Sequence, residues 1–510
     1  MSKGRMVGVA LVWILIIAIG AMTYKWIFVP RAEQEQKQAA EQKKKEVLAG
    51  TSSDSRYKHE VSFAIDSFSG YAVFRSDEFK NECASRGVKI NLVDDAADYP
   101  KRLKALQSGE VQMGVFTIDA LVKASAGLGD MPAVIVSLVD ETKGADAMVG
   151  SKVLVPSIDA LNDPNTKFVV TPDSPSETLA RVVMAYFNLD RLGADPWIKV
   201  DGAKKVYEEY RASKPTDKKV FVLWEPYVSK MTENGDYRVV IDSSKFKGYI
   251  VDVLVVSRDF LVKNEDVVKS VVESYFRANF AVRHRMVELV QDDSQITGEK
   301  FKPDQAKKVA GGIQWKNTQE NYAHFGMAGG TGYQHIDDMI TNITAVLRKT
   351  NGIVADPTKG KPNLLYYDKI LRHMFDNGFH PGFGSEEVRQ ENKLAALTDD
   401  EWKSLRPVGT LQVPRLVFAR GTARLTEASE GTLADLAKNL KTWPQYYLVV
   451  RGNCSKEGDV DANKKLAADR AKVAMDWLIQ NGVDRNRIRA DTSEPNGSMT
   501  VAFILGQMAY

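Results

Sequence analysis

The sequence predicts a multidomain α/β chain that begins with one membrane-spanning helix and ends in a smaller α+β domain. Three observations predict this. Residues 6–24 form an uninterrupted apolar run, short apolar runs alternate with amphipathic segments from residue 61 onward, and a second such series starts near residue 411. The 510 residues are enough for about three to four domains.

The composition is that of a folded chain. Of the residues, 44% are hydrophobic and 26% are charged. The chain has 69 Lys and Arg residues and 66 Asp and Glu residues, which gives a net charge of +3. This balance excludes a disordered chain and gives no electrostatic reason to expect nucleic-acid binding. Cys83 and Cys454 are the two cysteines, too few for a disulfide framework or a structural zinc site.

Residues 1–30 are predicted to form a membrane anchor. The nineteen residues 6–24 carry no charge and as a helix would span about 28 Å, close to the roughly 30 Å hydrocarbon core. Basic residues precede the run, which favours a cytoplasmic tail and export of the rest of the chain. The alternative is a cleaved signal peptide with Ala18-Ile19-Gly20 as its cleavage site, but the apolar run is longer than such peptides need.

A stalk and linker are predicted at residues 31–58. Residues 31–46 are rich in Glu, Gln, Lys and Ala, which favour helix. Residues 50–55, Gly-Thr-Ser-Ser-Asp-Ser, favour flexible coil.

An α/β domain is predicted from residue 59. Strands are expected at 61–65, 89–93, 111–116, 133–139, 168–170, 220–224, 238–241 and 250–257, and helices at 74–85, 99–107, 176–187 and 265–290. Strands that alternate with helices predict a parallel sheet covered on both faces.

Polar residues follow these strands, where open α/β sheets bind their ligands. The candidate ligand-binding residues are Ser67, Tyr71, Thr117, Asp119, Ser174, Ser176, Trp224, Glu225 and Asp252. Ser174 and Ser176 stand at a predicted helix N-terminus, where free N–H groups favour an anion. The alternative, equally favoured, is that the two serines only cap the helix N-terminus and bind no ligand.

The order of several landmarks resembles the periplasmic solute-binding proteins of nitrate, sulfonate, taurine and thiamine-precursor ABC transporters. The landmarks are residues 144–149, 157–161, 171–179, 222–228 and 250–256. The resemblance covers about residues 59–330 and implies a two-lobed fold that closes on a small ligand, with the second lobe at about 155–245. By position it places Ser67, Thr117, Ser174, Trp224 and Asp252 at the ligand. The domain is expected to extend to residue 395 through a further helical part, whose role the sequence leaves open.

A smaller domain is predicted at residues 411–510, after a linker at 396–410. Strands are expected at 416–418, 446–451, 487–490 and 500–505, and helices at 426–441 and 463–480. This order predicts an α+β sandwich with the helices on one face of a sheet.

The same region resembles the OmpA-like peptidoglycan-binding domains. The resemblance rests on Gly452-Asn453-Cys454-Ser455, then Gly458, then Asn463 and the segment Asp469-Arg470-Ala471. In that family an Asp and an Arg grip the diaminopimelate of the wall peptide. Arg470 and Asn463 are in place, but Ser455 stands at the Asp position. Loss of that carboxylate is expected to weaken wall binding by about 1.5 to 3 kcal/mol.

Enzyme motifs are absent from the sequence. It contains no Gly-x-Ser-x-Gly elbow, no His-Glu-x-x-His and no Cys-x-x-Cys, and its six histidines show no ligand spacing. Nothing matches the cofactor lysine or the cysteines of the thiamine-pyrimidine synthases, the enzymatic relatives of this binding fold. We therefore expect no enzymatic activity, no cofactor and no metal.

The sequence as a whole predicts a single-pass protein of the bacterial inner membrane whose bulk lies in the periplasm and is tethered to the wall. It would capture a small anionic solute for uptake or sensing, with a permease or sensor as membrane partner. The alternative is a structural wall tether or stator-like anchor, whose middle domain is a spacer or protein-binding module. Ion conduction is disfavoured because residues 6–24 hold no ionisable carboxylate.

Overall fold

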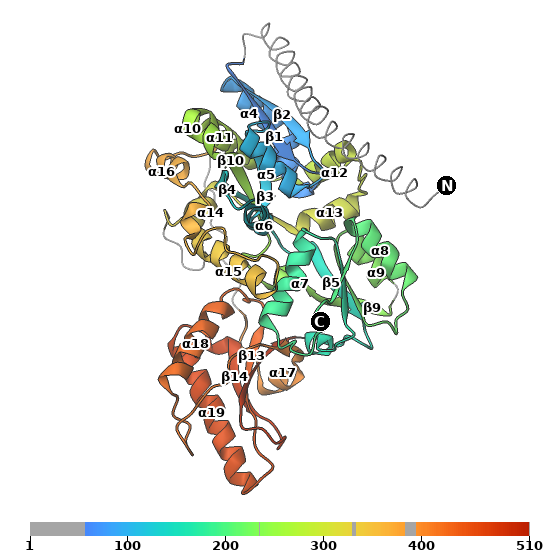
Figure 1. The fold of residues 1–510 in the computed structure, drawn as a ribbon, viewed down its shortest axis with the longest axis vertical. Coiled ribbons are helices and arrows are strands. Elements are labelled where there is room, and N and C mark those ends of the chain that lie inside the picture. The colour runs from blue at the N-terminus through green and yellow to red at the C-terminus, as the bar shows by residue number, and fades with distance from the viewer. Residues whose placement is uncertain (1–56, 234, 329–332, 383–393, 509–510) are drawn as a thin grey trace, which may run out of the picture. The chain divides into compact units, whose positions relative to one another are not determined.

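The middle region consists of two α/β lobes, each built on one β-sheet (Figure 1). The computed structural model describes residues 57–233, 235–328, 333–382 and 394–508. Contacts divide the chain into one unit up to Glu60 and a second, compact unit from Val61 onward. The two lobes and the C-terminal domain all belong to the second unit. The two-lobed fold implied by the resemblance is therefore confirmed.

The first lobe contains a six-stranded sheet of order β11-β4-β10-β3-β1-β2. Its strands are β1 (His59–Ile65), β2 (Val88–Asp94), β3 (Met113–Thr117), β4 (Ala133–Thr142), β10 (Val251–Ser257) and β11 (Ile313–Trp315). β1 and β3 are parallel, whereas β10 runs antiparallel to both β3 and β4. The prediction of a wholly parallel sheet is thus wrong. Because the chain returns from the second lobe, β10 has to start at the edge where β3 and β4 end.

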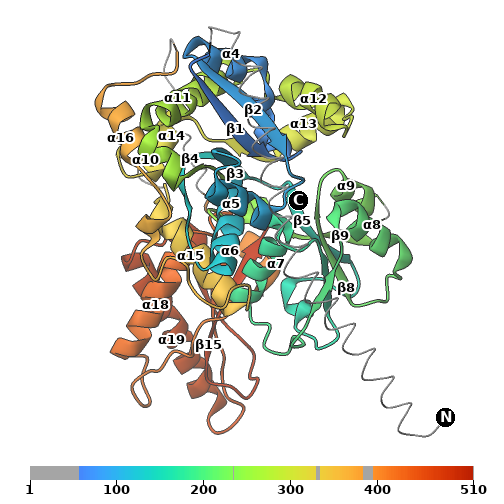
Figure 2. The same ribbon diagram turned by 45° about the horizontal axis from the view of Figure 1, so that its top comes forward.

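The helices of the first lobe cover both faces of this sheet (Figure 2). They are α3 (Ala72–Arg75), α4 (Asp77–Ser85), α5 (Tyr99–Ser108), α6 (Ile118–Leu128), α10 (Arg258–Lys263), α11 (Glu265–Val282) and α12 (Met286–Thr297). The helix predicted at 265–290 is broken into α11 and α12, because α12 turns away to pack on α3 and α13. The helix predicted at 74–85 is interrupted at Ser76, whose hydroxyl caps α4 by accepting from the Phe79 N–H.

The helical part after residue 299 completes the first lobe. It contains α13 (Pro303–Gly311), α14 (Thr318–His324), α15 (Ile336–Lys349) and α16 (Lys369–Asp376). β11 extends the sheet beside β4, and α16 packs on β4. α15 contacts both α6 of the first lobe and α7 of the second, so this segment supports the junction between the lobes.

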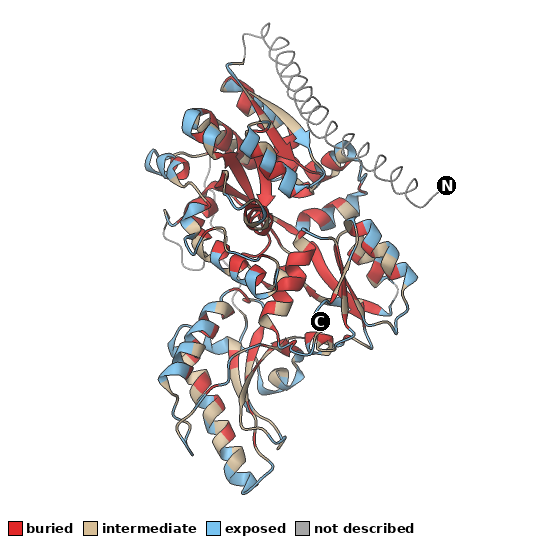
Figure 3. Ribbon diagram, viewed as in Figure 1, coloured by how far each residue is buried: buried red, intermediate tan, exposed pale blue. Residues whose placement is uncertain are grey.

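The second lobe contains a five-stranded sheet of order β7-β6-β8-β5-β9. Its elements are β5 (Asp146–Ser151), β6 (Lys167–Val170), α7 (Pro175–Tyr186), β7 (Trp197–Lys199), α8 (Gly202–Ala212), β8 (Lys219–Trp224), α9 (Tyr227–Thr232) and β9 (Tyr237–Asp242). Alternate strand residues enter two cores: Met148 packs on the α7 side, whereas Ala147 and Val149 pack with α8 and α9. Figure 3 shows the resulting burial along these strands. Burial on both faces explains why they read as continuous apolar runs.

The C-terminal domain is a four-stranded sheet of order β12-β15-β13-β14, with two helices on one face (Figure 1). Its elements are α17 (Asp399–Ser404), β12 (Arg406–Thr410), α18 (Glu427–Leu440), β13 (Tyr447–Gly452), α19 (Val460–Gln480), β14 (Ile488–Thr492) and β15 (Val501–Gln507). Gly452 lets α19 approach β13, because a Cβ there would lie 2.1 Å from the Ala467 carbonyl oxygen.

Two expectations for this domain are corrected. The strand predicted at 416–418 is wrong: the stretch contains a single bridge from Phe418 to Leu425, and Val417 is 55% exposed. The edge strand is β12, which pairs with β15. β12 and α17 lie in the stretch predicted as a linker, so that stretch contributes to the sheet.

The C-terminal domain packs against the second lobe through Trp443. The buried indole lies edge-on to Tyr186, Phe187 and Phe246, with ring centroids 5.4 to 5.7 Å apart. The Lys247 N–H donates to the Thr442 carbonyl (2.9 Å). Phe246 and Lys247 belong to residues 243–250, the connection that returns the chain from the second lobe to the first. The C-terminal domain therefore contacts one of the two connections between the lobes.

In the part of the chain that the structure describes, none of the helices combines the length and the apolar character needed to cross a membrane. The span predicted at residues 6–24 lies outside the described residues, as does the stalk up to residue 56.

Candidate functional site

Four polar residues meet at the edge of the first-lobe sheet that faces the second lobe. In the sheet, Asp252 of β10 stands opposite Thr117 on one side and Asp140 on the other. The Tyr71 hydroxyl donates a hydrogen bond to the Asp252 carboxylate. Antiparallel insertion of β10 causes this meeting, because the first residues of β10 lie beside the last residues of β3 and β4.

Asp140 and Asp252 form a buried acidic pair. Asp140 is fully buried, and its carboxylate oxygens have no hydrogen-bond donor among the described residues other than the neighbouring Asp252 carboxyl. Burial raises the pKa of Asp140 to about 7. Burial, and then the neighbouring Asp140 carboxyl, also raise the pKa of Asp252. The pair therefore retains a proton near neutral pH, because two adjacent buried carboxylates resist double ionisation.

A second acidic pair lies where α6 and α7 approach each other. Asp146 at the start of β5 accepts a hydrogen bond from the Ser176 hydroxyl (2.7 Å), and Asp119 of α6 accepts one from Thr178 of α7. Burial raises the pKa of Asp146 to about 7, and Asp119 adds to that shift. Burial likewise raises the pKa of Asp119, against the hydrogen bonds it accepts. The contact between Asp119 and Thr178 joins the two lobes directly.

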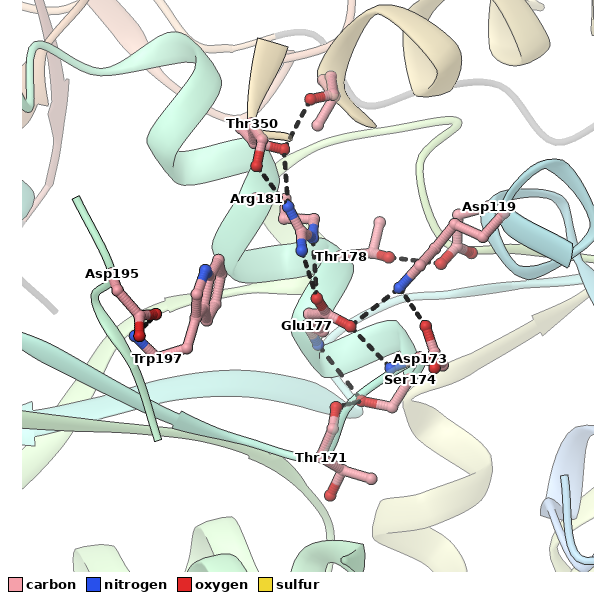
Figure 4. Close-up of polar contacts among 12 residues, drawn as sticks. Asp119, Thr171, Asp173, Ser174, Glu177, Thr178, Arg181, Asp195, Trp197 and Thr350 are labelled. Carbon is pink, nitrogen blue, oxygen red and sulfur yellow. Dashed lines mark hydrogen bonds and ion pairs between the residues drawn. The ribbon is translucent and has the colours of Figure 1, made fainter. Parts of the chain in front are cut away.

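Glu177 of α7 holds the lobes together through charge. Lys123 of α6 donates to Glu177 Oε2 (3.0 Å) and pairs with Asp173 (2.5 Å), while Arg181 donates to Glu177 Oε1 (2.6 and 2.9 Å). Figure 4 shows Glu177 between Arg181 and Asp173. Burial opposes ionisation of Glu177, but Lys123 and Arg181 outweigh it and lower its pKa to about 2. Glu177 is therefore a carboxylate whose charge is already matched.

A hollow of about 320 Å³ opens at this junction. Tyr99, Ala120 and Lys123 of the first lobe line it together with Asp173 of the second. Ala120 follows Asp119 in the chain, so the hollow lies next to the second acidic pair. Small-molecule sites commonly lie in such openings between two lobes or domains.

The other predicted ligand-binding residues have different surroundings. Ser67 is exposed, and Trp224 is half-buried opposite Asp146 in the sheet. Ser174 caps α7 by accepting from the Glu177 N–H (3.3 Å) and donates to the Thr171 carbonyl (2.7 Å). Glu225 pairs with Lys308 of α13 (2.8 Å), which is a further contact across the junction.

The structure thus brings Tyr71, Thr117, Asp119, Ser176 and Asp252 to the junction. Asp140 lies in the polar stretch that follows the strand predicted at 133–139, but neither Asp140 nor Asp146 is among the candidate ligand-binding residues named from the sequence. The rule that selected Asp252 applies to both, because each lies near a strand end at the same junction. The hydroxyls on which the expectation of an anionic solute rested are engaged, Ser174 as a cap and Ser176 with Asp146. Carboxylates and basic residues both lie around them, since Lys123 and Arg181 pair with Glu177 of the same helix, so the anionic solute stays a prediction.

The candidate wall-binding site lies on α19. Asn463 and Arg470 are two helical turns apart and share one face of the helix. Arg470 Nε donates to the Thr422 carbonyl (3.0 Å), and the guanidinium lies 4.9 Å from the Phe418 ring centre. Its Nη1 and Nη2 donate to no described residue. Burial, and then Arg415, lower the pKa of Arg470. The guanidinium edge thus remains available for a carboxylate.

Ser455 lies in a loop braced from both sides. Its N–H contacts the Met499 sulfur (3.2 Å), and its hydroxyl accepts from the Glu457 N–H (3.0 Å). The Asn463 amide donates to the Glu457 carbonyl (2.7 Å) and so ties this loop to α19. Asp459, four residues further along the chain, caps α19 by accepting from the Ala462 N–H (3.0 Å). Asp459 therefore acts as a helix cap.

The described ranges contain no cluster of potential metal ligands. No group of three or more His, Cys, Asp or Glu side chains there is arranged to hold a metal ion.

Comparisons with known proteins find similarities to two parts of the chain. Residues 417–499 match the OmpA family. The peptidoglycan-associated lipoprotein of Mesorhizobium japonicum is 32% identical over 75 residues, which are 15% of this chain and 45% of that protein. The lipoprotein of Brucella melitensis is 29% identical over 75 residues, with the same shares. The chain therefore spans less than half the length of the curated relatives it matches.

Solved structures resemble the middle region. The periplasmic aliphatic sulphonate binding protein SsuA from Escherichia coli is 15% identical, covers 62% of this chain and 99% of its own, and has a TM-score of 0.45. The periplasmic nitrate-binding protein NrtA from Synechocystis PCC 6803 is 11% identical, covers 57% of this chain and 88% of its own, and has a TM-score of 0.39.

Proposed function

We propose that this chain is a binding protein of the bacterial cell envelope that captures a small solute between its two lobes and holds the cell wall through its C-terminal domain. Residues 1–30 would anchor it in the inner membrane, residues 31–58 would form a stalk, and residues 59–395 would bind the solute in the periplasm. The wall-binding domain would begin at β12. Captured solute would pass to a membrane permease or be reported to a sensor.

The observation that carries the solute-binding part is the convergence of polar side chains from both lobes. Asp119 meets Thr178, and Lys123 meets Glu177, across the junction of the two lobes. Two-lobed proteins of this kind bind ligands by hinge closure, which requires ligand groups on both sides. We propose Tyr71, Thr117, Asp119, Ser176 and Asp252 as ligand-binding residues, with Trp224, Glu225, Ser67 and Ser174 at the margin.

Solute retention tests this proposal. Full-length protein purified without added ligand is expected to release a small molecule on denaturation, detectable by mass spectrometry, because a closed two-lobed protein releases its ligand slowly. A retained compound at roughly stoichiometric amount supports the proposal. The result that opposes it is a protein that releases nothing and whose melting midpoint no solute raises, since a ligand at about a hundred times its Kd adds about 2.7 kcal/mol of stability.

The wall-binding part rests on the match to the OmpA family and on Arg470. The peptide stems of peptidoglycan present carboxylates. A guanidinium whose Nη1 and Nη2 groups are free can bind a carboxylate bidentately. Ser455 offers a hydroxyl where the family has a carboxylate, so the ammonium group of diaminopimelate lacks its usual counter-charge. We propose weak binding that depends on Arg470, with Asn463 holding the Ser455 loop.

Sedimentation of full-length protein with purified peptidoglycan tests the wall site. Arg470→Ala is expected to abolish co-sedimentation because the peptide carboxylate loses its guanidinium partner. Ser455→Asp is expected to strengthen it about tenfold or more, since a charge-assisted hydrogen bond contributes about 1.5 to 3 kcal/mol. The whole chain is required, because a fragment that starts at residue 411 lacks β12 and the second-lobe residues that pack against Trp443.

Lys472→Ala is the matched control. Lys472 is also an exposed cation of α19, but it pairs with Asp476 (2.5 Å) one turn away. It should leave sedimentation unchanged. Equal loss in both variants would indicate a general charge effect, and undiminished binding of the Arg470 variant would place the wall contact elsewhere.

A second candidate function is a passive tether whose middle domain is a spacer. The ion pairs of Lys123 with Glu177 and of Lys308 with Glu225 favour it, because they join the lobes without any ligand. A spacer would retain no solute and respond to none, so the retention experiment separates the two functions.

A further inference from the structure

The four buried carboxylates at the junction of the lobes share one property: none forms an ion pair with a described basic residue. Asp140 and Asp252 contact each other and the Tyr71 hydroxyl, while Asp119 and Asp146 accept from hydroxyl groups. All four side chains are buried, with at most 5% exposure. Buried carboxylates are normally paired with a cation or hydrogen-bonded by several donors.

Other buried carboxylates in the same region do pair with basic residues. Glu141, adjacent to Asp140, accepts from Lys316 Nζ (2.8 Å), and Glu177 accepts from Lys123 and Arg181. Asp66 pairs with Arg102 (3.0 Å). Among the buried carboxylates described, Glu320 of α14 also has no cationic partner, but it accepts from neutral donors, the Asn317 N–H and the Gln314 amide.

Unsatisfied acceptors give the second observation. Apart from the neighbouring Asp252 carboxyl, neither oxygen of Asp140 has a hydrogen-bond donor among the described residues, and Oδ1 of Asp119 receives none. Asp140 is 0% exposed and Asp119 is 1% exposed, so water does not reach these oxygens from the surface. Buried acceptors without donors are rare in folded proteins, and they are expected where a ligand supplies the donor.

Aromatic rings surround the Asp140 and Asp252 pair. Phe68 and Tyr71 lie edge to face with ring centroids 5.2 Å apart, and Trp315 donates through Nε1 to the Gly70 carbonyl (2.8 Å) between them. At Gly70 a Cβ would lie 2.4 Å from Asp140 Oδ2 and 2.3 Å from a Phe68 ring carbon, so the carboxylate and the ring both pack closely against this glycine. Aromatic faces beside carboxylates are a favourable environment for an organic ammonium group.

We infer that the solute of this protein is a small organic cation, whose ammonium group is bound by Asp140 and Asp252 within the aromatic surround, with Asp119 and Asp146 receiving a second cationic or hydrogen-bond-donating group. The inference rests on the proposed solute-binding function and names its ligand class. A bare metal ion fits less well, because the described residues hold no group of three ligands with metal-binding geometry. An anion would face these four carboxylates, and the nearby Lys123 and Lys316 already pair with Glu177 and Glu141.

Matched pairs of probes test the charge requirement on the full-length protein. Choline is compared with 3,3-dimethylbutan-1-ol, which has the same shape without the charge, and putrescine with butane-1,4-diol. Taurine and nitrate form the anionic arm. We expect choline or putrescine to raise the melting midpoint in a concentration-dependent manner and the neutral and anionic probes to leave it unchanged.

Two variants connect the response to the site. Asp252→Asn preserves the shape and removes the carboxyl that would ionise when a cation binds, and is expected to raise the Kd of the responding cation at least about tenfold. Asp236→Asn, an exposed carboxylate of the second lobe, should leave the Kd unchanged. An isosteric change at Asp252 creates no cavity, so the variant is expected to fold.

The outcomes separate this inference from the proposed function. A midpoint raised by taurine or nitrate but by no cation overturns the cationic ligand and leaves solute binding in place. Equal responses to choline and its neutral analogue, or an unchanged Kd in Asp252→Asn, also overturn it. No response to any probe, together with no retained solute, counts against solute binding itself and favours the spacer.

Discussion

Replacing Trp443 with alanine is expected to lower the free energy of unfolding by about 3 to 5 kcal/mol, the usual cost of truncating a fully buried aromatic side chain. Trp443 is 1% exposed, and its ring packs against Tyr186, Phe187 and Phe246 of the second lobe as well as Tyr446 of its own domain. The loss should therefore affect both sides of the contact. Chemical denaturation of the full-length protein measures it.

Hydrogen exchange locates the effect. In Trp443→Ala, amides near Phe246 in the return connection should exchange faster, together with those of α18. Trp402→Ala is the matched control, because Trp402 is only partly buried and packs on Tyr447 within the C-terminal region. It should have a smaller effect that does not reach residues 243–250. A loss of protection in Trp443→Ala confined to the C-terminal domain would show that the contact with the second lobe contributes nothing to stability.

Replacing Asp140 with asparagine is expected to stabilise the unliganded protein at pH 8 by about 2 to 4 kcal/mol. Burial raises the pKa of Asp140 from 3.8 to about 7. Each unit of difference between the folded and unfolded states corresponds to about 1.4 kcal/mol, so ionisation of the buried group costs several kcal/mol at high pH. Asparagine avoids this cost and can donate to Asp252. Residues that bind ligands are often unfavourable for stability in this way.

The sign of the pH dependence follows from the raised pKa. The folded state binds the Asp140 proton more tightly than the unfolded state, so stability falls as pH rises from about 4 through 7. The charged groups around it are Asp252, Glu141 and Lys316, with the Tyr71 and Tyr275 phenols adjacent. The stability difference between variant and wild type should therefore be small near pH 4 and largest near pH 8.

Denaturation curves at several pH values check this prediction. His324 acts in the opposite direction, because burial lowers its pKa to about 3, but it is present in both proteins and cancels in the difference. Asp236→Asn, on the surface, should show no such gap. A gap that does not change with pH, or an Asp140→Asn protein that is less stable than wild type at pH 8, would contradict the raised pKa.

Local patterns in the sequence were sufficient for most of the regular structure. The apolar runs predicted β4 and β8, and α5 ends where expected because Gly109 adopts a left-handed conformation at its C-cap. The spacing of Asn463 and Arg470 put both on one face of a helix, and α19 contains them. These features depend on side-chain period and turn chemistry over a few residues, which the sequence displays directly.

Relations between distant segments were decided only by the tertiary structure. The sequence could not show that β10 enters antiparallel between β3 and β4, or that β12 rather than residues 416–418 forms the edge of the C-terminal sheet. Both depend on which strands pair, and strand pairing is a competition among partners far apart in the chain.

The charge of the candidate site was decided in the same way. Read along the chain, Asp119, Asp140, Asp146 and Asp252 are isolated acids among hydroxyls, and the serines before α7 favoured an anion. The sequence by itself determined that polar residues follow the strands. Only the tertiary structure, through the antiparallel insertion of β10 and the contact of α6 with α7, brings these four carboxylates together in a buried place without basic partners. Burial and electrostatic neighbours set a site's preference for charge, and both arise here from contacts between residues up to 133 positions apart in the sequence.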